Sequence, residues 1–394
     1  MADGSRRIGV FPALLACVLA ACGGGGDASG PPALPAPPSP SAGTLGDGRL
    51  AELVEWARDA QDVPAMGVII IRGGQVAERA VVGLRSADGG AAATVEDRWH
   101  MGSITKSMTS TLAALLVEDG LISWDTKPLD VWPELANDIH PDFRNATLRQ
   151  FLSHTSGMKR DDDWSGAADS ASGSAMQKRH EWARRLLSRA PEFANGTWSY
   201  SNMGYVVAGA MLETRTNTAW ETLLTTRVFV PLGMTHSGFG APGTPGQLDQ
   251  PLGHWSRGSG FDPVPVGAGA DNWIALGPAG TVHTTLDDFT HYLQAHLDGA
   301  RGMPGLLTTD SFDTLHAPVA SDYALGWGVS GNLSPLGAAG FSHNGSNLRW
   351  FALTWFSPQK NAGLLIVLNG GGDRGFAAMS ALDALLRQRI AVSP

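Results

Sequence analysis

Cysteine is nearly missing from this 394-residue sequence, and the two that occur, Cys17 and Cys22, both lie near the N-terminus. None is left in the body of the chain for a disulfide or a thiolate metal cluster. Basic residues are also few: 28 lysines and arginines stand against 37 acidic residues, for a net charge of -9, and no basic stripe occurs. Because neutralising phosphates needs clustered lysine and arginine, this composition argues against nucleic acid as a partner.

Two common catalytic signatures are missing as well. No G-x-S-x-G elbow occurs, which argues against an ordinary α/β-hydrolase. His180 and Glu181 begin an H-E-x-x-H pattern, but position 184 is arginine, so that zinc motif is absent. The other histidines, including His283, His291 and His296, are predicted to be surface or core residues. We therefore expect no metal and no cofactor.

An apolar run over residues 8–21 follows two arginines and is too short for a convincing membrane span. This pattern is typical of a signal peptide, which we place at residues 1–21. The run ends in Leu-Ala-Ala-Cys-Gly at residues 19–23, which resembles a bacterial lipoprotein box. The mature protein is then expected to begin at lipidated Cys22, held at a membrane by its acyl chains. The alternative is an ordinary cleaved signal in which Cys22 is incidental.

Glycine and proline dominate the segment that follows, and residues 22–48 are predicted to be a tether without a packed core. A proline-rich chain extends by about 3.1 Å per residue, so the tether spans tens of ångströms. This reach suits an enzyme of the bacterial cell envelope, lipid-anchored on the periplasmic side of a membrane.

Residues 49–390 carry a mixed pattern that predicts one large domain or two closely joined ones. An amphipathic helix comes first, then a hairpin around Gly73-Gly74, then a mainly helical stretch over about 103–300. Strands at 350–356 and 364–368 and a helix at 375–390 end the chain. The predicted fold class is α+β: an antiparallel sheet built from both chain ends and flanked by terminal helices, with an all-α insertion.

The first candidate for chemistry is Ser103-Ile104-Thr105-Lys106, at the start of a helical run. Positions i and i+3 share a helix face, so Ser103 and Lys106 are predicted neighbours. The helix dipole and partial burial would lower the pKa of the lysine, which could then take the serine proton. Alone, an S-x-x-K pattern is more often a capping serine and a solvated lysine.

Two further motifs follow along the chain. Tyr200-Ser201-Asn202 precedes a helix; a tyrosine beside a cationic lysine would have a lowered pKa and relay protons, and the asparagine amide could hold a substrate carbonyl or the lysine. The bland alternative is a polar loop with Asn202 as the helix cap. His343-Asn344-Gly345-Ser346 precedes the C-terminal strands, where a glycine lets substrate backbone approach and the Ser346 amide could join that of Ser103 as an oxyanion donor. The alternative there is a surface turn.

Together the three motifs resemble the serine β-lactamase and penicillin-binding-protein family, in the branch of class C β-lactamases, DD-peptidases and esterases. Segments 152–158, 229–235 and 277–282 resemble the H-T-S-G, P-L-G-M and glycine-rich stretches of that branch. The resemblance covers about residues 49–390. It implies a β-lactamase/transpeptidase-like fold, an α/β sandwich with an all-α domain and the active site in the groove between them.

The resemblance also implies roles. Ser103 would be the nucleophile, Lys106 and Tyr200 would handle protons, and Asn202, His343, Gly345 and Ser346 would bind substrate. Which of Lys106 and Tyr200 is the base stays open, since the two would titrate as a coupled pair. The polar stretch 159–177 is predicted to be a surface loop bordering the groove.

One departure bears on the substrate. Potent class C β-lactamases usually carry Lys-Thr-Gly at the third motif, whereas this chain has His343-Asn344-Gly345. A histidine is mostly neutral near pH 7, so it would attract a β-lactam carboxylate weakly. The sequence therefore favours a serine hydrolase that cleaves small acyl esters or peptide-like amides through an acyl-enzyme. The alternatives are a true class C-like β-lactamase and a non-catalytic envelope protein that binds cell-wall peptides. The sequence leaves the oligomeric state open.

Overall fold

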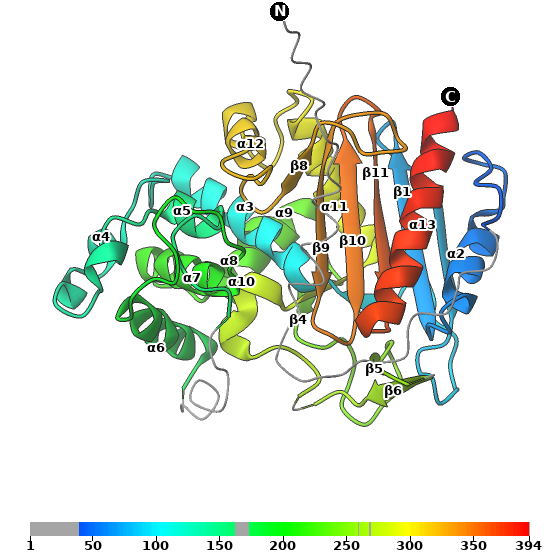
Figure 1. Ribbon diagram of the computed structural model, residues 1–394, viewed down its shortest axis with the longest axis horizontal. Coiled ribbons are helices and arrows are strands. Elements are labelled where there is room, and N and C mark those ends of the chain that lie inside the picture. The colour runs from blue at the N-terminus through cyan, green and yellow to red at the C-terminus, as the bar shows by residue number, and fades with distance from the viewer. Residues whose placement is uncertain (1–38, 162–172, 259, 268, 394) are drawn as a thin grey trace, which may run out of the picture.

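The protein is seen here as a computed structural model that describes residues 39–161, 173–258, 260–267 and 269–393 (Figure 1). Cys22, the predicted signal peptide and most of the predicted tether lie outside these residues. Within the described part, no helix combines the length and the apolar character needed to cross a membrane.

A six-stranded antiparallel sheet with the order β2-β1-β11-β10-β9-β8 forms the centre of the molecule. Its strands come from the two ends of the chain: β1 Ala65–Arg72, β2 Gln75–Gly83, β8 Gly328–Ser330, β9 Gly340–Ser346, β10 Phe351–Ser357 and β11 Ala362–Leu368. The hairpin of β1 and β2 turns at Gly73 and Gly74, whose φ angles of 61° and 80° are those that glycine adopts without strain. The predicted hairpin and antiparallel sheet are therefore confirmed.

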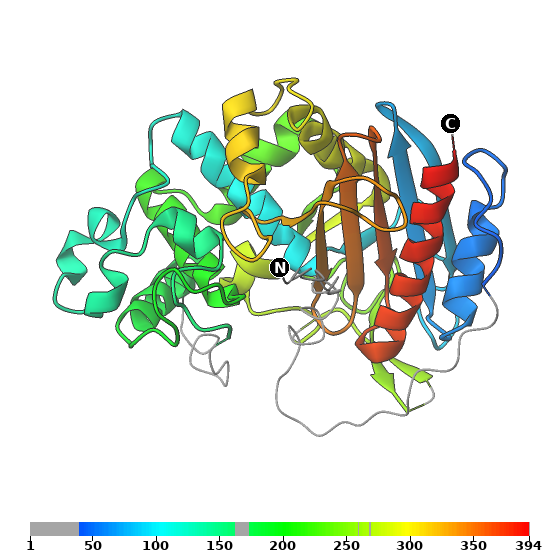
Figure 2. The same cartoon turned by 45° about the horizontal axis from the view of Figure 1, so that its top comes forward.

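Helices cover both faces of this sheet. On one face lie α2 (Leu50–Asp59) and α13 (Gly372–Val392), and on the other lies α11 (Leu286–Gly299) (Figures 1 and 2). The alternation of side chains explains why β1 is apolar throughout: Val68 and Ile70 pack in the core under α2 and α13, while Ile69 and Ile71 pack in the opposite core.

A helical region lies beside the sheet, to the left of it in Figures 1 and 2. Its principal helices are α3 Thr105–Glu118, α4 Pro128–Val131, α5 Leu148–Leu152, α6 Ala175–Leu187, α7 Asn202–Thr216, α8 Trp220–Leu224, α9 Val230–Leu232, α10 Gly277–Gly280 and α12 Thr309–His316. Short 3-10 segments are η2 Gly102–Ile104, η3 Pro133–Leu135, η4 Pro141–Phe143 and η6 Ile274–Leu276, and Thr225–Phe229 is a π-helix. The α+β fold with a helical region is thus confirmed.

The middle of the chain is less purely helical than the sequence predicted. A three-stranded sheet joins β3 (Arg98–His100), β7 (Val282–Thr285) and β4 (Gly238–Phe239), and β5 (Gly253–Arg257) pairs with β6 (Gly260–Val264). These strands have two to five residues. Such short segments carry too little alternation to stand out in a periodicity search, because tertiary pairing rather than local pattern specifies them.

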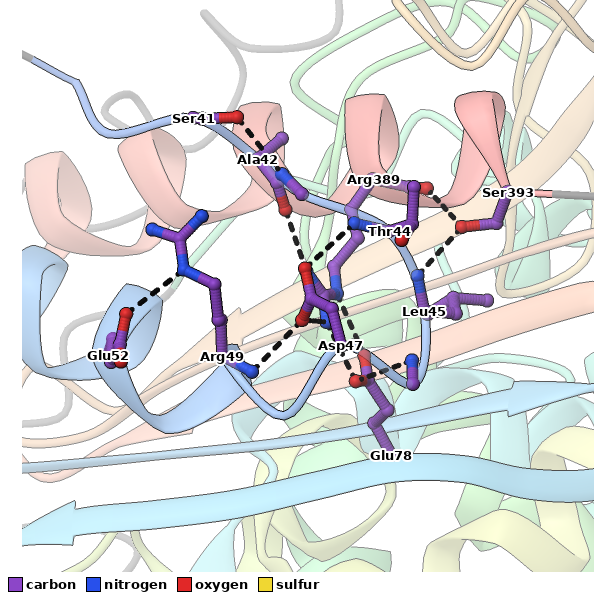
Figure 3. A network of polar contacts seen from close by, with 12 residues as sticks. Ser41, Ala42, Thr44, Leu45, Asp47, Arg49, Glu52, Glu78, Arg389 and Ser393 are labelled. Carbon is purple, nitrogen blue, oxygen red and sulfur yellow. Dashed lines mark hydrogen bonds and ion pairs between the residues drawn. The ribbon is translucent and has the colours of Figure 1, made fainter.

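A buried arginine fixes the first described residues against the last helix (Figure 3). Arg389 of α13 donates to Glu78 Oε2 at 2.8 Å and to the Ala42 carbonyl at 2.8 Å, and it also pairs with Asp47. The hydrogen bond from Arg389 holds the pKa of Asp47 well below its usual range. The segment that leads out of the domain toward the N-terminus is therefore anchored beside its C-terminus.

Candidate active site

Ser103 and Lys106 lie together where η2 passes into α3. Lys106 is fully buried, and its Nζ donates to Ser103 Oγ at 2.9 Å and to the carbonyl of Ala279 in α10 at 2.7 Å. The helical spacing explains the first contact, since residues three apart face the same side. A buried amine next to a serine hydroxyl is the arrangement that activates a nucleophile.

The turn before Ser103 is held by a histidine that the sequence did not single out. The backbone N–H of Gly102 donates to His100 Nδ1 at 3.0 Å, and His100 Nε2 lies 2.7 Å from Asp271 Oδ1. Gly102 has a φ of 50°, and a Cβ there would lie 2.3 Å from the backbone N of Ser346. Only glycine fits this position, because a larger residue would push β9 away from the nucleophile.

β9 passes equally close to Ser103 from its own side. A Cβ on Gly345 would lie 2.0 Å from the Met101 carbonyl oxygen and 2.5 Å from the Ser103 backbone N. The backbone of Gly345 and Ser346 therefore packs directly against the turn that carries the nucleophile. This brings together the two segments whose amides, those of Ser103 and Ser346, the sequence predicted as oxyanion donors.

Tyr200 completes the group around Ser103. Its hydroxyl is hydrogen-bonded with Ser103, and Lys106 Nζ stands 4.9 Å from the centroid of its ring. The prediction of a lowered pKa is wrong: burial raises the pKa of Tyr200 above its ordinary value, and this outweighs the lowering by the Ser103 hydrogen bond. Tyr200 is therefore a neutral phenol in the resting site, suited to donate a proton rather than to accept one.

An aromatic cluster surrounds Tyr200 on its buried side. The ring of His154, which lies in the H-T-S-G segment, has its centroid 4.4 Å from that of Tyr200, 5.3 Å from that of Tyr205 and 4.7 Å from that of Tyr323. The backbone N–H of Ser201 donates to His154 Nδ1 at 3.0 Å. Burial, and next the charge of Lys106, lower the pKa of His154 well below its usual value, so this histidine stays neutral.

His343 is the third-motif residue, and it lies inside the protein rather than at a surface turn. Its Nε2 lies 3.1 Å from the Tyr323 hydroxyl, and its Nδ1 lies 2.6 Å from its neighbour's carbonyl oxygen, that of Asn344. Burial lowers the pKa of His343 to about 3, with a further lowering by the charge of Lys106. The prediction that this histidine is neutral near pH 7 is therefore confirmed, because its pKa lies well below 7.

Asn202 does not point its amide at Lys106 in this structure. Its Nδ2 donates to Asp161 Oδ1 at 2.6 Å, and its backbone N–H donates to the Arg160 carbonyl at 2.9 Å. Nor does it cap α7: that role belongs to Ser201, whose Oγ accepts from the Gly204 N–H at 2.9 Å. The start of the polar stretch 159–177 thus borders the site, while residues 162–172 lie outside the described part.

The sequence reasoning missed several residues that shape this site. Tyr205 and Tyr323 belong to the aromatic cluster, and His100 and Asp161 hold the turn and the asparagine. The signal that could have found the first two is rarity, since the chain has only four tyrosines. Three of the four contact side chains of α3: Tyr200 lies over Lys106, the Tyr205 hydroxyl lies 3.3 Å from Ser110 Oγ, and the Tyr292 hydroxyl donates to Ser107 Oγ at 3.0 Å. Among the described residues, no group of three or more metal-ligating side chains comes together.

Comparison with known proteins agrees with this geometry. A family model described as Beta-lactamase matches residues 50–388. Penicillin-binding protein 4 of Amycolatopsis lactamdurans is 28% identical over 335 residues, which cover 81% of this chain and 84% of the relative. Protein flp of Staphylococcus aureus (strain N315) is 20% identical over 325 residues, 82% of this chain but 62% of the relative.

Solved structures share the fold at low sequence identity. The octameric penicillin-binding protein homologue of Pyrococcus abyssi has a TM-score of 0.70 and 22% identity, covering 86% of this chain and 77% of that chain. The D-alanine carboxypeptidase AmpC of Burkholderia cenocepacia has a TM-score of 0.66 and 21% identity, covering 86% of this chain and 97% of that chain.

Proposed function

The chain belongs to the beta-lactamase family of serine β-lactamase and penicillin-binding-protein-like hydrolases, and from this we propose that it cleaves esters or peptide-like amides through a covalent acyl-enzyme on Ser103. The observation that carries the proposal is the hydrogen bond of 2.9 Å between Lys106 Nζ and Ser103 Oγ. The hydroxyl of Tyr200 is hydrogen-bonded with the same serine. A binding module has no evident need for these three groups at one point.

In the acylation step, Ser103 Oγ attacks the carbonyl carbon of the substrate. This step requires that Lys106 has first lost a proton: the Ser103 proton then passes to the lone pair of Lys106 Nζ, while one N–H of Lys106 keeps its bond to the Ala279 carbonyl. Tyr200, which burial keeps protonated, then donates to the leaving alcohol or amine and takes the proton back from Lys106. Lys106 is thus the base in this scheme, and Tyr200 is the acid.

The negative charge that develops on the carbonyl oxygen needs preorganised donors. The backbone N–H groups of Ser103 and Ser346 are the proposed donors, since β9 and η2 pack closely at Gly345. Deacylation runs the same steps with water: Lys106 takes a proton from water as the water oxygen attacks the ester carbon, and Ser103 Oγ leaves with a proton that returns to it from Lys106 through Tyr200.

The third motif supports esters or peptides over β-lactams as substrates. A His343 with a pKa near 3 carries no charge at neutral pH, and Asn344 supplies no hydroxyl. A fixed cation and a hydroxyl would otherwise help to anchor a β-lactam carboxylate. Some relatives are named for peptide chemistry, among them a D-alanine carboxypeptidase. A true β-lactamase and a non-catalytic binder of cell-wall peptides remain the alternatives.

Covalent labelling tests the nucleophile. A fluorophosphonate probe should label the wild type and Ser110→Ala, a control serine on the same helix, but should not label Ser103→Ala. Loss of a nucleophile typically costs several powers of ten in rate, while the thermal transition of Ser103→Ala should stay nearly unchanged. Labelling of Ser103→Ala at the wild-type rate would refute the assignment, and an unlabelled wild type would favour the non-catalytic alternative.

A turnover panel tests the substrate class. We expect kcat/KM for a short acyl ester to exceed that for a chromogenic cephalosporin, with a D-Ala-D-Ala peptide as the third substrate. The double variant His343→Lys with Asn344→Thr should narrow the gap about tenfold to a hundredfold, the worth of one charged hydrogen bond. Faster turnover of the cephalosporin than of the ester by the wild type would make the β-lactamase alternative the better one.

We also propose that Cys22 is lipidated and anchors the enzyme to the periplasmic side of an envelope membrane. The support is the sequence of residues 19–23 and the glycine- and proline-rich segment after it. Cys22→Ala should release the protein from the membrane fraction or block its maturation. Unchanged partitioning of this variant into detergent would contradict the proposal.

A further inference from the structure

The turn that carries Ser103 is held by the ring of His100. The Gly102 N–H donates to His100 Nδ1 at 3.0 Å, so Nδ1 carries a lone pair, and the proton of the neutral imidazole lies on Nε2. The ring is buried and stacks on that of Trp350, with centroids 5.5 Å apart and an angle of 24° between the planes. His100 is therefore fixed in place, and its Nε2–H is free to interact with a further group.

The turn that follows Ser346 is held in a similar way by the side chain of Asn347. This side chain is buried, and its Oδ1 accepts from the backbone N–H groups of Arg349 at 3.3 Å and Trp350 at 3.2 Å. These contacts fix the backbone at the end of β9, one residue after the proposed oxyanion donor Ser346. The amide nitrogen of Asn347, Nδ2, remains available as a donor.

The side chains of His100 and Asn347 meet at one oxygen, Oδ1 of Asp271. Asn347 Nδ2 donates to this oxygen at 3.0 Å, and His100 Nε2 lies 2.7 Å from it. The second contact lacks the alignment of a hydrogen bond, so it is an attraction between the carboxylate charge and the dipole of the ring N–H. The backbone N–H of Asn272 also donates to Oδ1, at 2.6 Å, and the Asp271 side chain is only 12% exposed. One nearly buried carboxylate therefore joins the two turns.

This connection bears on the oxyanion site, because its two donors come from separate segments. A developing oxyanion needs the N–H groups of Ser103 and Ser346 at the same time, and catalytic groups must be held to within about 0.5 Å. Gly102 and Gly345 allow the two segments to approach each other. Glycine does not fix that approach, however, because its backbone is the least restricted of all residues. A carboxylate bonded to both turns supplies the missing restraint.

We infer that Asp271 is a positioning residue, which fixes the distance between the N–H groups of Ser103 and Ser346. It acts through His100 and Asn347 and touches no reacting atom. This inference rests on the proposed function. Loss of the carboxylate leaves the nucleophile and its proton-transfer partners in place but allows the two turns to move separately. The transition state, whose oxygen carries the charge, then loses more binding energy than the bound substrate does.

Ester hydrolysis and boronate affinity together test this role. Phenylboronic acid forms a tetrahedral adduct with an active-site serine, which resembles the transition state and so binds through the oxyanion donors. For Asp271→Ala we expect kcat for a short acyl ester to fall about 100-fold, the cost of a misplacement of about 1 Å. KM should stay nearly constant, because acylation and deacylation use the same donors. The affinity for phenylboronic acid, measured by calorimetry, should fall by a similar factor.

A conservative variant separates positioning from a general loss of structure. The amide oxygen of Asp271→Asn can still accept from Asn347, so this variant should recover about tenfold of the lost kcat, the worth of one hydrogen bond. Asn347→Ala removes one of the two connections and should lower kcat and boronate affinity together. It provides the same test if Asp271→Ala does not fold.

Asp383→Ala is the matched control. Asp383 is a buried carboxylate on α13 that accepts from Trp355 Nε1 at 2.8 Å and pairs with Arg387 at 2.8 Å. Its loss should lower the thermal transition, because it leaves buried partners unpaired. The values of kcat and of the boronate affinity should remain those of the wild type.

Three results would overturn the role of Asp271 alone: folded Asp271→Ala with wild-type kcat, a fall in kcat without a fall in boronate affinity, or an equal loss of kcat in Asp383→Ala. In each case the wild type still hydrolyses the ester, so the proposed function stands. A wild type that neither hydrolyses the ester nor binds phenylboronic acid would overturn the proposed function and this inference with it.

Discussion

Gly345→Ala is the substitution for which the structure makes the sharpest prediction. The added methyl group would lie 2.0 Å from the Met101 carbonyl oxygen, 2.5 Å from the Ser103 backbone N and 2.9 Å from the Gly102 carbonyl carbon. All three atoms belong to the backbone, so no side-chain rotation can relieve the contact. β9 and the turn of Ser103 must move apart instead.

The size of this movement sets the expected loss of activity. Ordinary van der Waals contact begins near 3.4 Å, so the closest pair must separate by more than one ångström. That shift separates the two segments that supply the proposed oxyanion donors, Ser103 and Ser346. Because misplacement of catalytic groups by about 1 Å costs about 100-fold, we expect kcat/KM to fall at least 100-fold, or about 2.7 kcal/mol of transition-state stabilisation.

Hydrolysis of a short acyl ester measures this loss. Gly331→Ala is the matched control, because a Cβ on Gly331, just after β8, meets nothing within 4 Å. It should keep wild-type kcat/KM, and thermal unfolding should show that Gly345→Ala still folds. If folded Gly345→Ala retains activity within about threefold of the wild type, the close packing of β9 against Ser103 does not position the oxyanion donors.

Other predictions concern protons. Lys106→Ala and Tyr200→Phe should each slow acylation by several powers of ten in stopped-flow assays. The double variant should acylate only slightly more slowly than either single variant, because the two groups act as one unit. Additive losses in rate would mean that the two residues have independent roles. His316 and His343 have pKa values of about 3 when folded. Because the unfolded chain takes up protons at these histidines below about pH 6.5 and the folded protein does so only near pH 3, the folded state loses stability as the pH falls between these values. The free energy of unfolding measured in urea should therefore decrease by roughly 2 kcal/mol per histidine between pH 7 and 5. Equal free energies of unfolding at the two pH values would contradict this prediction.

Much of the fold was predictable because its elements carry local signals. The glycine pair at 73 and 74 specified the hairpin, and apolar spacing predicted the first helix of the domain, α2, and the last, α13, the latter to within three residues at each end. The small strands β4 to β7 were missed because their residues show no alternation and pair only after the chain has folded. β8 was missed for the same reason, since it is three residues long.

The candidate active-site residues were predictable from the sequence where they belong to short motifs. Spacing alone places Ser103 and Lys106 on one helix face, and the structure brings Tyr200 to the same point. The pKa of Tyr200 was not predictable in this way. Its direction depends on burial by side chains distant in the chain, such as His154, which lies 46 residues before it.

Burial has opposite effects on the pKa values of the tyrosines and the histidines of the site. Burial raises the pKa of Tyr200 and Tyr323 and lowers the pKa of His154 and His343, so all four side chains are neutral at pH 7. The charge of Lys106 lowers the pKa of both histidines further. In the proposed mechanism, the protons that move during acylation are therefore exchanged among Ser103, Lys106 and Tyr200, while the neutral histidines keep theirs. We therefore expect the neutral third motif to select a substrate by the fit of its backbone against Gly345 rather than by a carboxylate charge.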